Sequence, residues 1–322
     1  MRPGLLPLLF PEDLMVRLNR CLDLGSPDAF HDLRGRRGRS ALARAEVLVT
    51  SWGCTPLDDE LLDAAPRLKA VIHAAGSVKH HLSEEAWRRG ILVSSAADAN
   101  IEPVVDFTIA MITLAGKRAL PLAARYARGH LPALRDSPGN DGRVVGVVGA
   151  SRIGRGVIAR LRTSGFRVLV HDPYLTPEEA RRLDAEPSDL DTLCACSDIV
   201  SLHAPDLPET RHLIDARRLS LMTDGAILIN TARGSLVDTE ALVQHCGSGR
   251  IDAVLDVTDP EPLPSGHPLF ALPNVVITPH LAGVQGNEIR RFGSYATAEV
   301  ERYTHGQRLL GSIEVTALPT LA

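Results

Sequence analysis

The stretch that decides the fold is residues 143–174, which read RVVGVVGASRIGRGVIARLRTSGFRVLVHDPY. Its β-branched run at 144–148 predicts a buried strand, and the small residues GAS directly after the run predict a tight turn. A helical pattern then continues to Gly165, and the apolar residues 166–170 predict a second strand, which ends at Asp172. This order of strand, turn, helix and strand indicates a parallel α/β sheet.

The turn is typical of dinucleotide binding, in which N–H groups at a helix start hold a pyrophosphate and an acid about 20 residues further on accepts a ribose hydroxyl. Asp172 stands at that position, and its carboxylate would repel a 2′-phosphate, which indicates NAD rather than NADP. The glycine pattern reads Gly149-x-Ser151-x-x-Gly154. Serine in place of the middle glycine predicts weaker or slightly displaced binding, offset in part if its hydroxyl donates to a phosphate oxygen. A βαβ unit that binds no nucleotide is the alternative interpretation.

Composition narrows the class of protein. With 322 residues, 44% of them hydrophobic, the chain is long enough for two domains of ordinary size. The formal net charge is −4, and arginines are scattered among acids rather than gathered on a basic face. We therefore expect a small-molecule substrate, with neither nucleic acid nor a membrane as partner.

Cysteine and histidine spacings favour a reducing compartment without a metal site. The five cysteines form no C-x-x-C pair and no metal-ligand spacing with histidine. The cluster of His73, His80 and His81 has no carboxylate or cysteine partner in its spacing, so we expect no metal there. An N-terminal apolar run is broken by Pro7 and is too short for a signal peptide or a membrane span. Together these features predict a cytoplasmic protein.

Alternating strands and helices predict two domains, each of the parallel α/β class. In the first domain we expect strands at 5–10, 46–50, 70–73 and 91–94. One long helical segment from Asn100 to Gly129 should connect it to a doubly wound sheet with further strands at 198–203, 226–230, 251–257 and 274–278. A last helix at 286–306 should return to the first domain. The prediction is a discontinuous flavodoxin-like substrate domain (1–101 and 288–322), a Rossmann cofactor domain (102–287), and a cleft between them.

Three polar residues each follow an apolar strand: Arg233 in NTARG, Glu261 in DVTDPEP and His280 in ITPHLAG. Because the carboxyl ends of strands in a doubly wound sheet share one edge, these residues can converge. Arginine binds the carboxylate and carbonyl of a 2-oxo acid through parallel N–H donors. Histidine can protonate the carbonyl oxygen while hydride reaches the carbon, and a neighbouring carboxylate orients the imidazole. The pattern predicts hydride transfer to a 2-oxo acid.

With these motifs, nearly the whole sequence resembles the D-isomer-specific 2-hydroxyacid dehydrogenase family. The matching segments include VSLHAPDLPETRHLI, LINTARGSLVDTEAL, LDVTDPEP and NVVITPHLAG. The resemblance implies that Arg233 binds substrate, Glu261 supports the histidine and His280 is the general acid and base. It also implies NAD as cofactor and a homodimer joined through the cofactor domains.

The candidate residues fall into two further sets. The glycine turn, Asp172 and the family resemblance together imply that the cofactor is bound by Gly149, Ser151, Arg152, Ile153, Gly154, Asp172, His203, Pro205, Thr210, Thr231, Ala232, Asp256, His280 and Gly283. We expect the substrate to be bound by Ala75, Gly76, Ser77, Asn100 and Arg233, and the resemblance implies that Asn100 lies near the nicotinamide.

Departures from the family pattern leave the substrate open. The loop HAAGSVKHH has Ser77 and Lys79 where a glycine and an aspartate are common in the family. Lys79 either pairs with a second acidic group on the substrate or is an ordinary surface lysine. A chain ending at residue 322 argues against phosphoglycerate dehydrogenases with a regulatory tail, and Glu261 argues against formate dehydrogenases, which have glutamine there. The alternative function is an NAD(H)-sensing regulatory protein, of the corepressor type, with little catalysis.

Overall fold

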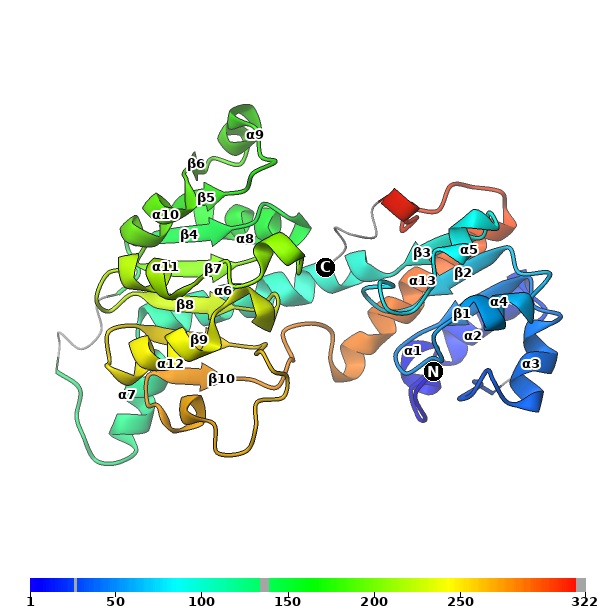
Figure 1. Cartoon of the computed structure of the whole chain (residues 1–322), viewed down its shortest axis with the longest axis horizontal. Coiled ribbons are helices and arrows are strands. Elements are labelled where there is room, and N and C mark those ends of the chain that lie inside the picture. Colours follow the sequence, from blue (N-terminus) through cyan, green and yellow to red (C-terminus); the bar gives the residue numbers. More distant parts are fainter. Residues whose placement is uncertain (26–27, 134–138, 317–322) are drawn as a thin grey trace. The chain divides into compact units, whose positions relative to one another are not determined.

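The structure is a computed structural model that describes residues 1–25, 28–133 and 139–316. It divides into two compact units (Figure 1). The first unit is Met1–Asn100 with the segment that starts at Val284, and the second unit is Ile101–Gly283. Each holds one parallel sheet, which confirms the predicted α/β class with a Rossmann-type sheet.

The sheet of the second unit has the strand order β10-β9-β8-β7-β4-β5-β6, and every pairing is parallel. Since β4 lies between β5 and β7, the direction in which strands are added reverses at β4, which is where doubly wound folds bind ligands. The strands are β4 (Val144–Val148), β5 (Arg167–His171), β6 (Glu186–Pro187), β7 (Ile199–Leu202), β8 (Ile227–Asn230), β9 (Asp252–Leu255) and β10 (Val275–Ile277).

Helices cover both faces of this sheet because successive strand residues point to opposite sides. Leu228 packs in one apolar cluster, whereas its neighbours Ile227 and Ile229 pack in the other. The α-helices are α6 (Ile101–Gly116), α7 (Ala119–Tyr126), α8 (Arg152–Arg162), α9 (Pro177–Arg182), α10 (Leu190–Cys196), α11 (Ala216–Leu221) and α12 (Thr239–Gly247), and the short 3₁₀ turns are η3 (Pro208–Thr210), η4 (Gly234–Leu236) and η5 (Pro268–Ala271).

The prediction of one unbroken helix from Asn100 to Gly129 is wrong, because α6 ends at Gly116 and α7 begins after Arg118, whose φ is +53°. Two side chains just before β4 bind the carbonyl groups that this break leaves open. Asn140 Nδ2 donates to the Thr113 carbonyl at 3.0 Å, and Arg143 Nη1 donates to the Gly116 carbonyl at 2.8 Å. These donors satisfy carbonyl groups that the end of a helix leaves without an intrahelical partner.

Residues Ala97–Gly116 form a helical stretch that is long and apolar enough to cross a membrane, judged by length and composition alone. Within it, α6 packs against α8 and β8, and Val105 and Ile112 are fully buried in the apolar core of the second unit. This packing buries 33% of the apolar stretch inside the protein.

The first unit has a three-stranded sheet in the order β1-β2-β3, with strands β1 (Val47–Thr50), β2 (Ala70–His73) and β3 (Leu92–Ser95). Around it lie α1 (Leu6–Leu9), α2 (Glu12–Cys21), α3 (Arg36–Leu42), α4 (Asp59–Asp63), α5 (Glu85–Arg88), η1 (Ala97–Asn100), η6 (Gly286–Ile289) and α13 (Arg290–Thr304). The last helix returns the chain to this unit and packs on α2, α1 and β2.

The predicted first strand at 5–10 is wrong, because this segment forms the helix α1. Pro7 has no N–H to donate to a neighbouring strand, and prolines are accepted in the first turn of a helix. The Leu9 and Phe10 N–H groups instead donate to the carbonyls of Leu5 and Leu6 at 3.0 and 2.8 Å. Leu9 and Phe10 are both buried, so the segment still contributes to the core.

Candidate functional site

The turn between β4 and α8 is built around two glycines. Gly149 has φ +98°, and a β-carbon there would lie 2.6 Å from the Ala204 backbone nitrogen. A β-carbon on Gly154 would lie 2.0 Å from the Gly149 carbonyl oxygen. Both positions therefore require glycine, and the close packing leaves the N-terminal end of α8 approachable by a phosphate.

Ser151 stands at the middle position without strain, since its φ is −61°. Its Oγ accepts the Gly154 N–H at 3.2 Å and caps α8. A hydroxyl that accepts in this way keeps its own proton for donation, for instance to a phosphate oxygen.

Asp172 follows β5 and lies beside the glycine turn. Its Oδ2 accepts the Ala150 N–H at 2.7 Å, and its Oδ1 accepts the Tyr174 N–H at 2.8 Å. The sequence predicted a ribose-binding acid here; the structure adds that the same carboxylate holds the turn. A carboxylate has about four acceptor positions, so two remain for ribose hydroxyls. The glycine turn and this acid fit the ribose and pyrophosphate of NAD.

Arg152 and Ile153 are the first two residues of α8, where N–H groups face the turn. Arg155, one turn further, fixes the glycine turn from the helix side, because its Nε donates to the Ala150 carbonyl at 2.9 Å. Arg155 was not predicted; an arginine four residues after an N-cap is too common a pattern to single out.

The segment after β7 packs beneath the glycine turn. The His203 ring is buried, with Nε2 2.9 Å from Ser201 Oγ, and burial lowers the pKa of His203 to about 3. The predicted cofactor residue His203 thus has a neutral ring directed into the protein. Thr210 Oγ1 donates to the Pro205 carbonyl at 2.7 Å and accepts the Leu207 N–H at 2.8 Å, which closes the loop that carries both predicted residues.

The end of β8 carries Arg233 on a turn that Asn230 holds. Asn230 Oδ1 accepts the Ala232 N–H at 3.0 Å, and its Nδ2 donates to the Arg233 carbonyl at 2.8 Å. Thr231 Oγ1 lies 2.9 Å from Thr108 Oγ1 on α6. Asn230 was not predicted, although an asparagine at the end of the apolar run ILIN is a signal that could have found it.

The Arg233 side chain is half-buried, and Nη1 donates to the Ala232 carbonyl at 2.6 Å. Burial lowers the pKa of the Arg233 guanidinium, while Asp206 and Glu261 act to raise it. A partly desolvated cation of this kind favours an anionic ligand. The turn packs closely against the segment that follows β9, because a β-carbon on Gly234 would lie 2.0 Å from the Thr258 backbone.

His280 and Glu261 form a direct pair, with His280 Nδ1 2.6 Å from Glu261 Oε1. Both side chains are about half exposed, at 52% and 42%. His280 has φ +51°, and its N–H donates to the carbonyls of Asp256 and Thr278 at 2.9 and 3.0 Å. The backbone therefore presents the imidazole at the end of β10.

Asp256 holds the loop that carries His280. Its Oδ1 accepts the Leu281 N–H at 2.9 Å and Thr278 Oγ1 at 2.5 Å, and its Oδ2 accepts the Ala282 N–H at 2.9 Å. The side chain is 2% exposed. Asp256 was predicted as a cofactor residue. In the structure its carboxylate accepts three hydrogen bonds from this loop, which ends next to the predicted Gly283.

The three predicted catalytic residues follow β8, β9 and β10, which are neighbours in the sheet. Glu261 and His280 are hydrogen-bonded, and Arg233 is close enough for Glu261 to influence the pKa of its guanidinium. Within the part of the chain that the structure describes, no group of three or more His, Cys, Asp or Glu residues is arranged to hold a metal.

The remaining predicted substrate residues belong to the first unit. Ala75 is buried and Ser77 is exposed in the loop after β2, and the Gly76 carbonyl between them accepts from Ser95 Oγ at 2.7 Å. Asn100 Oδ1 accepts the Val284 N–H at 2.8 Å. Asn100 therefore joins the two segments of the first unit at the points where the chain leaves it and returns.

Comparison with known proteins identifies the family of the chain. Residues 109–282 match the family model described as D-isomer specific 2-hydroxyacid dehydrogenase, NAD binding domain. The chain is 36% identical over 279 residues to the D-3-phosphoglycerate dehydrogenase of Mycobacterium leprae, covering 86% of this chain and 52% of that protein. It is 34% identical over 319 residues to the glyoxylate reductase of Thermofilum pendens, covering 93% and 90%. The chain thus spans about half the length of the phosphoglycerate dehydrogenases that it matches.

Solved structures give the same result. D-lactate dehydrogenase from Aquifex aeolicus, complexed with NAD and lactic acid, superposes with a TM-score of 0.70 at 27% identity over 92% of this chain and 94% of that one. A protein from Thermus thermophilus superposes with a TM-score of 0.77 at 33% identity over 95% and 97%. The fold and the glycine turn define a protein with an NAD-binding Rossmann domain. The chain belongs to the D-isomer specific 2-hydroxyacid dehydrogenase family.

Proposed function

We propose that this protein interconverts a small D-2-hydroxy acid and its 2-oxo acid with NAD(H) as cofactor. The observation that carries the proposal is the 2.6 Å bond between His280 Nδ1 and Glu261 Oε1, at a sheet edge that also presents the partly buried Arg233 guanidinium. A fixed imidazole beside a cation that favours anions is what reduction of a 2-oxo acid requires.

Each residue has a distinct task in this mechanism. Glu261 accepts from Nδ1 and fixes the ring, which assigns proton transfer to Nε2. During reduction Nε2 donates a proton to the carbonyl oxygen at C2, and during oxidation it takes the proton back. Arg233 binds the carboxylate and carbonyl through parallel N–H donors. Bound NADH supplies the hydride that C2 accepts.

The two units would divide these tasks. We assign the second unit, with the cofactor set from Gly149 to Gly283, to NAD binding, and the first unit to the substrate. In the first unit, the N–H groups of Ala75, Gly76 and Ser77 would donate to the substrate carboxylate, and Asn100 would lie near the nicotinamide. The unit boundaries at Asn100 and Val284 support this division.

A screen of 2-oxo acids with NADH tests the proposal and narrows the substrate. The names of the relatives suggest glyoxylate and a phosphorylated 3-carbon acid as members of the panel, together with pyruvate and larger 2-oxo acids. We expect NADH oxidation with at least one acid. Tight NADH binding without oxidation of NADH by any acid would favour the regulatory alternative.

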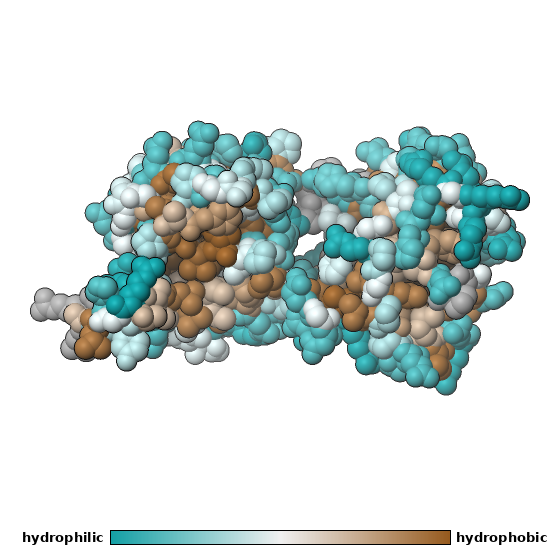
Figure 2. Space-filling model, turned by 90° about the horizontal axis from the view of Figure 1, so that it is seen from below, coloured by the Kyte–Doolittle hydropathy of each residue, from teal (hydrophilic) through white to brown (hydrophobic). Residues whose placement is uncertain are grey.

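We further propose a homodimer joined through the second units. Helix α7 is amphipathic yet has no buried residue in the single chain. The exposed large apolar residues of this unit include Leu114, Tyr126 and Leu131, and Figure 2 shows apolar side chains gathered on one face of it. A monomer in sedimentation equilibrium at micromolar concentration would contradict this proposal, and Tyr126→Glu should weaken a dimer.

The cytoplasm is the proposed compartment. All five cysteines are free thiols, and Cys194 and Cys246 are buried. Burial raises the pKa of these two thiols to about 11 and about 12, which keeps them protonated and unreactive.

A further inference from the structure

Two buried histidines close the base of the loop that joins β2 to α5. His73 is the last residue of β2, and His81 follows the loop; their rings stack with centroids 4.7 Å apart and planes 32° apart. The two residues are 4% and 8% exposed. His73 Nδ1 lies 2.8 Å from Thr50 Oγ1, whereas His81 Nε2 is buried and has no hydrogen-bond partner among the described residues.

Backbone hydrogen bonds fix both ends of this loop close to the two histidines. The His81 N–H donates to the Val78 carbonyl at 2.9 Å, and the His81 carbonyl accepts the Leu57 N–H at 2.8 Å. At the other end, the Ala74 N–H donates to the Thr50 carbonyl at 2.7 Å. Residues 74–79, here called the substrate loop, therefore leave and re-enter the protein at the stacked rings.

We propose that His73 and His81 are positioning residues: their stacked neutral rings hold the substrate loop in the shape that receives the substrate carboxylate, and proton uptake releases it. The substrate part of this inference rests on the proposed function. The rings themselves do not touch the reacting atoms, so their effect is on substrate binding through Ala75, Gly76 and Ser77.

The electrostatics of the pair give the direction of the effect. Burial, with a smaller contribution from His81, lowers the pKa of His73 to about 3. Burial, with a smaller contribution from the Met1 ammonium, lowers the pKa of His81 to about 4. Among the described residues, no carboxylate acts on the pKa of either ring. No described carboxylate therefore stabilises a proton on the closed pair.

An opened loop would expose both imidazoles, whose ordinary pKa is 6.5. Below that pH the open form binds protons that the closed form does not. The opening equilibrium should therefore rise as pH falls from 6.5 toward about 4, by up to about tenfold per pH unit for each histidine that is released. Above pH 6.5 the pair stays neutral in both forms, and pH has no effect through it.

Three variants test the proposal by steady-state kinetics. His81→Ala removes a ring and should raise KM for the 2-oxo acid by about tenfold or more, while kcat and the Kd for NADH change by less than about twofold. His81→Phe keeps a flat ring without a protonation site, so its KM should match the wild type near pH 7 and rise less below pH 6.5. His80→Ala is the matched control, since His80 is an exposed neighbour, and it should follow the wild type.

Either of two results would overturn the proposal: an unchanged KM in folded His81→Ala, or an acid rise of KM in His81→Phe equal to that of the wild type. Hydrogen exchange of residues 74–81 without substrate separates this inference from the proposed function. After division by the intrinsic exchange rate, an opening equilibrium that rises more steeply below pH 6.5 in the wild type than in His81→Phe, which keeps His73, supports the loop device even if no 2-oxo acid is reduced. An equally steep rise in both proteins rejects it.

Discussion

At the scale of single residues, two acids near the candidate site bind backbone N–H groups and so hold the loops in place. Asp172 holds the glycine turn through the Ala150 N–H, and Asp256 holds the His280 loop through the N–H groups of Leu281 and Ala282. Removing such a carboxylate leaves donors without an acceptor and moves the loop. Substitutions of these two acids would therefore change the loop geometry. The proposed proton transfer is tested more directly at residues whose side chains would contact the substrate.

His280→Gln is such a test. The amide cannot deliver a proton to a carbonyl oxygen, so turnover should fall by about 100-fold or more, the range for loss of a general acid, while the Kd for NADH stays within about twofold. Initial rates and NADH fluorescence titration measure the two quantities. Unchanged turnover would remove His280 from the mechanism. Glu261→Gln, which keeps an acceptor for Nδ1, should lose less.

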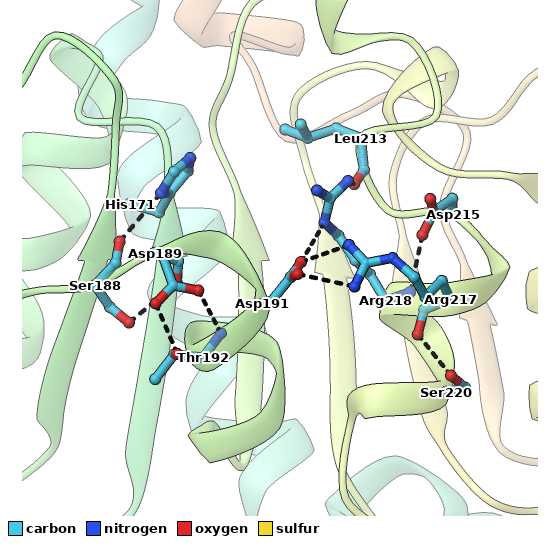
Figure 3. A network of polar contacts seen from close by, with 10 residues as sticks. All are labelled: His171, Ser188, Asp189, Asp191, Thr192, Leu213, Asp215, Arg217, Arg218 and Ser220. Carbon is cyan, nitrogen blue, oxygen red and sulfur yellow. Dashed lines mark hydrogen bonds and ion pairs between the residues drawn. The ribbon is translucent and has the colours of Figure 1, made fainter.

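At the scale of elements, helix ends decide local order. Five helices of the second unit, α8, α9, α10, α11 and α12, begin at Ser, Thr or Asp side chains that accept a backbone N–H. Helices α10 and α11 are also joined through Asp191, whose two oxygens accept from Arg217 Nη1 and Nη2 at 2.8 Å and from Arg218 Nε at 2.9 Å (Figure 3). These short helices are thus held in place by polar contacts as well as by apolar packing.

The cap of α8 can be tested by two substitutions at one position. Ser151→Ala removes the acceptor of the Gly154 N–H and should lower the free energy of unfolding by about 1 kcal/mol, whereas Ser151→Gly should cost only a few tenths of that. Urea denaturation measures both. Equal stability of the wild type and Ser151→Ala would show that the cap contributes nothing. NADH titration of the same pair reports whether the serine weakens cofactor binding.

The Asp191 contact should make stability depend on acid pH. The hydrogen bonds from Arg217 lower the pKa of Asp191 from its usual 3.8 to about 2. A lowered carboxyl pKa stabilises the fold above the unfolded value, and this stability is lost as pH falls from about 4 to about 2. Asp191→Asn should therefore lower Tm modestly at pH 7, with a difference from the wild type that narrows below about pH 4. Asp224→Asn, at an acid 86% exposed, is the control, and an equal effect there would contradict the prediction.

At the scale of the whole molecule, two units with separate sheets should respond separately to ligands. Apolar residues of the second unit form two clusters on either side of its sheet, and those of the first unit form two others. In the first unit, the fully buried Glu299 on α13 accepts from Ser94 Oγ and from the N–H groups of Leu310 and Gly311, which ties the C-terminal segment to β3. Each unit thus has its own apolar core.

Cofactor should stabilise the chain in a manner that distinguishes the two dinucleotides. NADH at about 100 times its Kd adds about 2.7 kcal/mol to the stability of whatever binds it, and NADPH should add less because Asp172 repels a 2′-phosphate. Differential scanning calorimetry with each dinucleotide measures the shift of the transition that belongs to the second unit. A larger shift with NADPH would overturn the assignment of NAD.

The sequence by itself determined the doubly wound class of the second unit, the glycine turn with its acid, and the positions of Arg233, Glu261 and His280 after successive strands. These follow from local patterns, because parallel strands bring their carboxyl ends to one edge whatever the details of packing. The tertiary structure alone decided that residues 6–9 form a helix, that the helix from Asn100 breaks at Arg118, and that Asn230 and Asp256 hold the loops of the site. It also brought His73 against His81. Each of these depends on which backbone donor or acceptor lies within about 3 Å of a side chain, and local sequence patterns do not specify that distance.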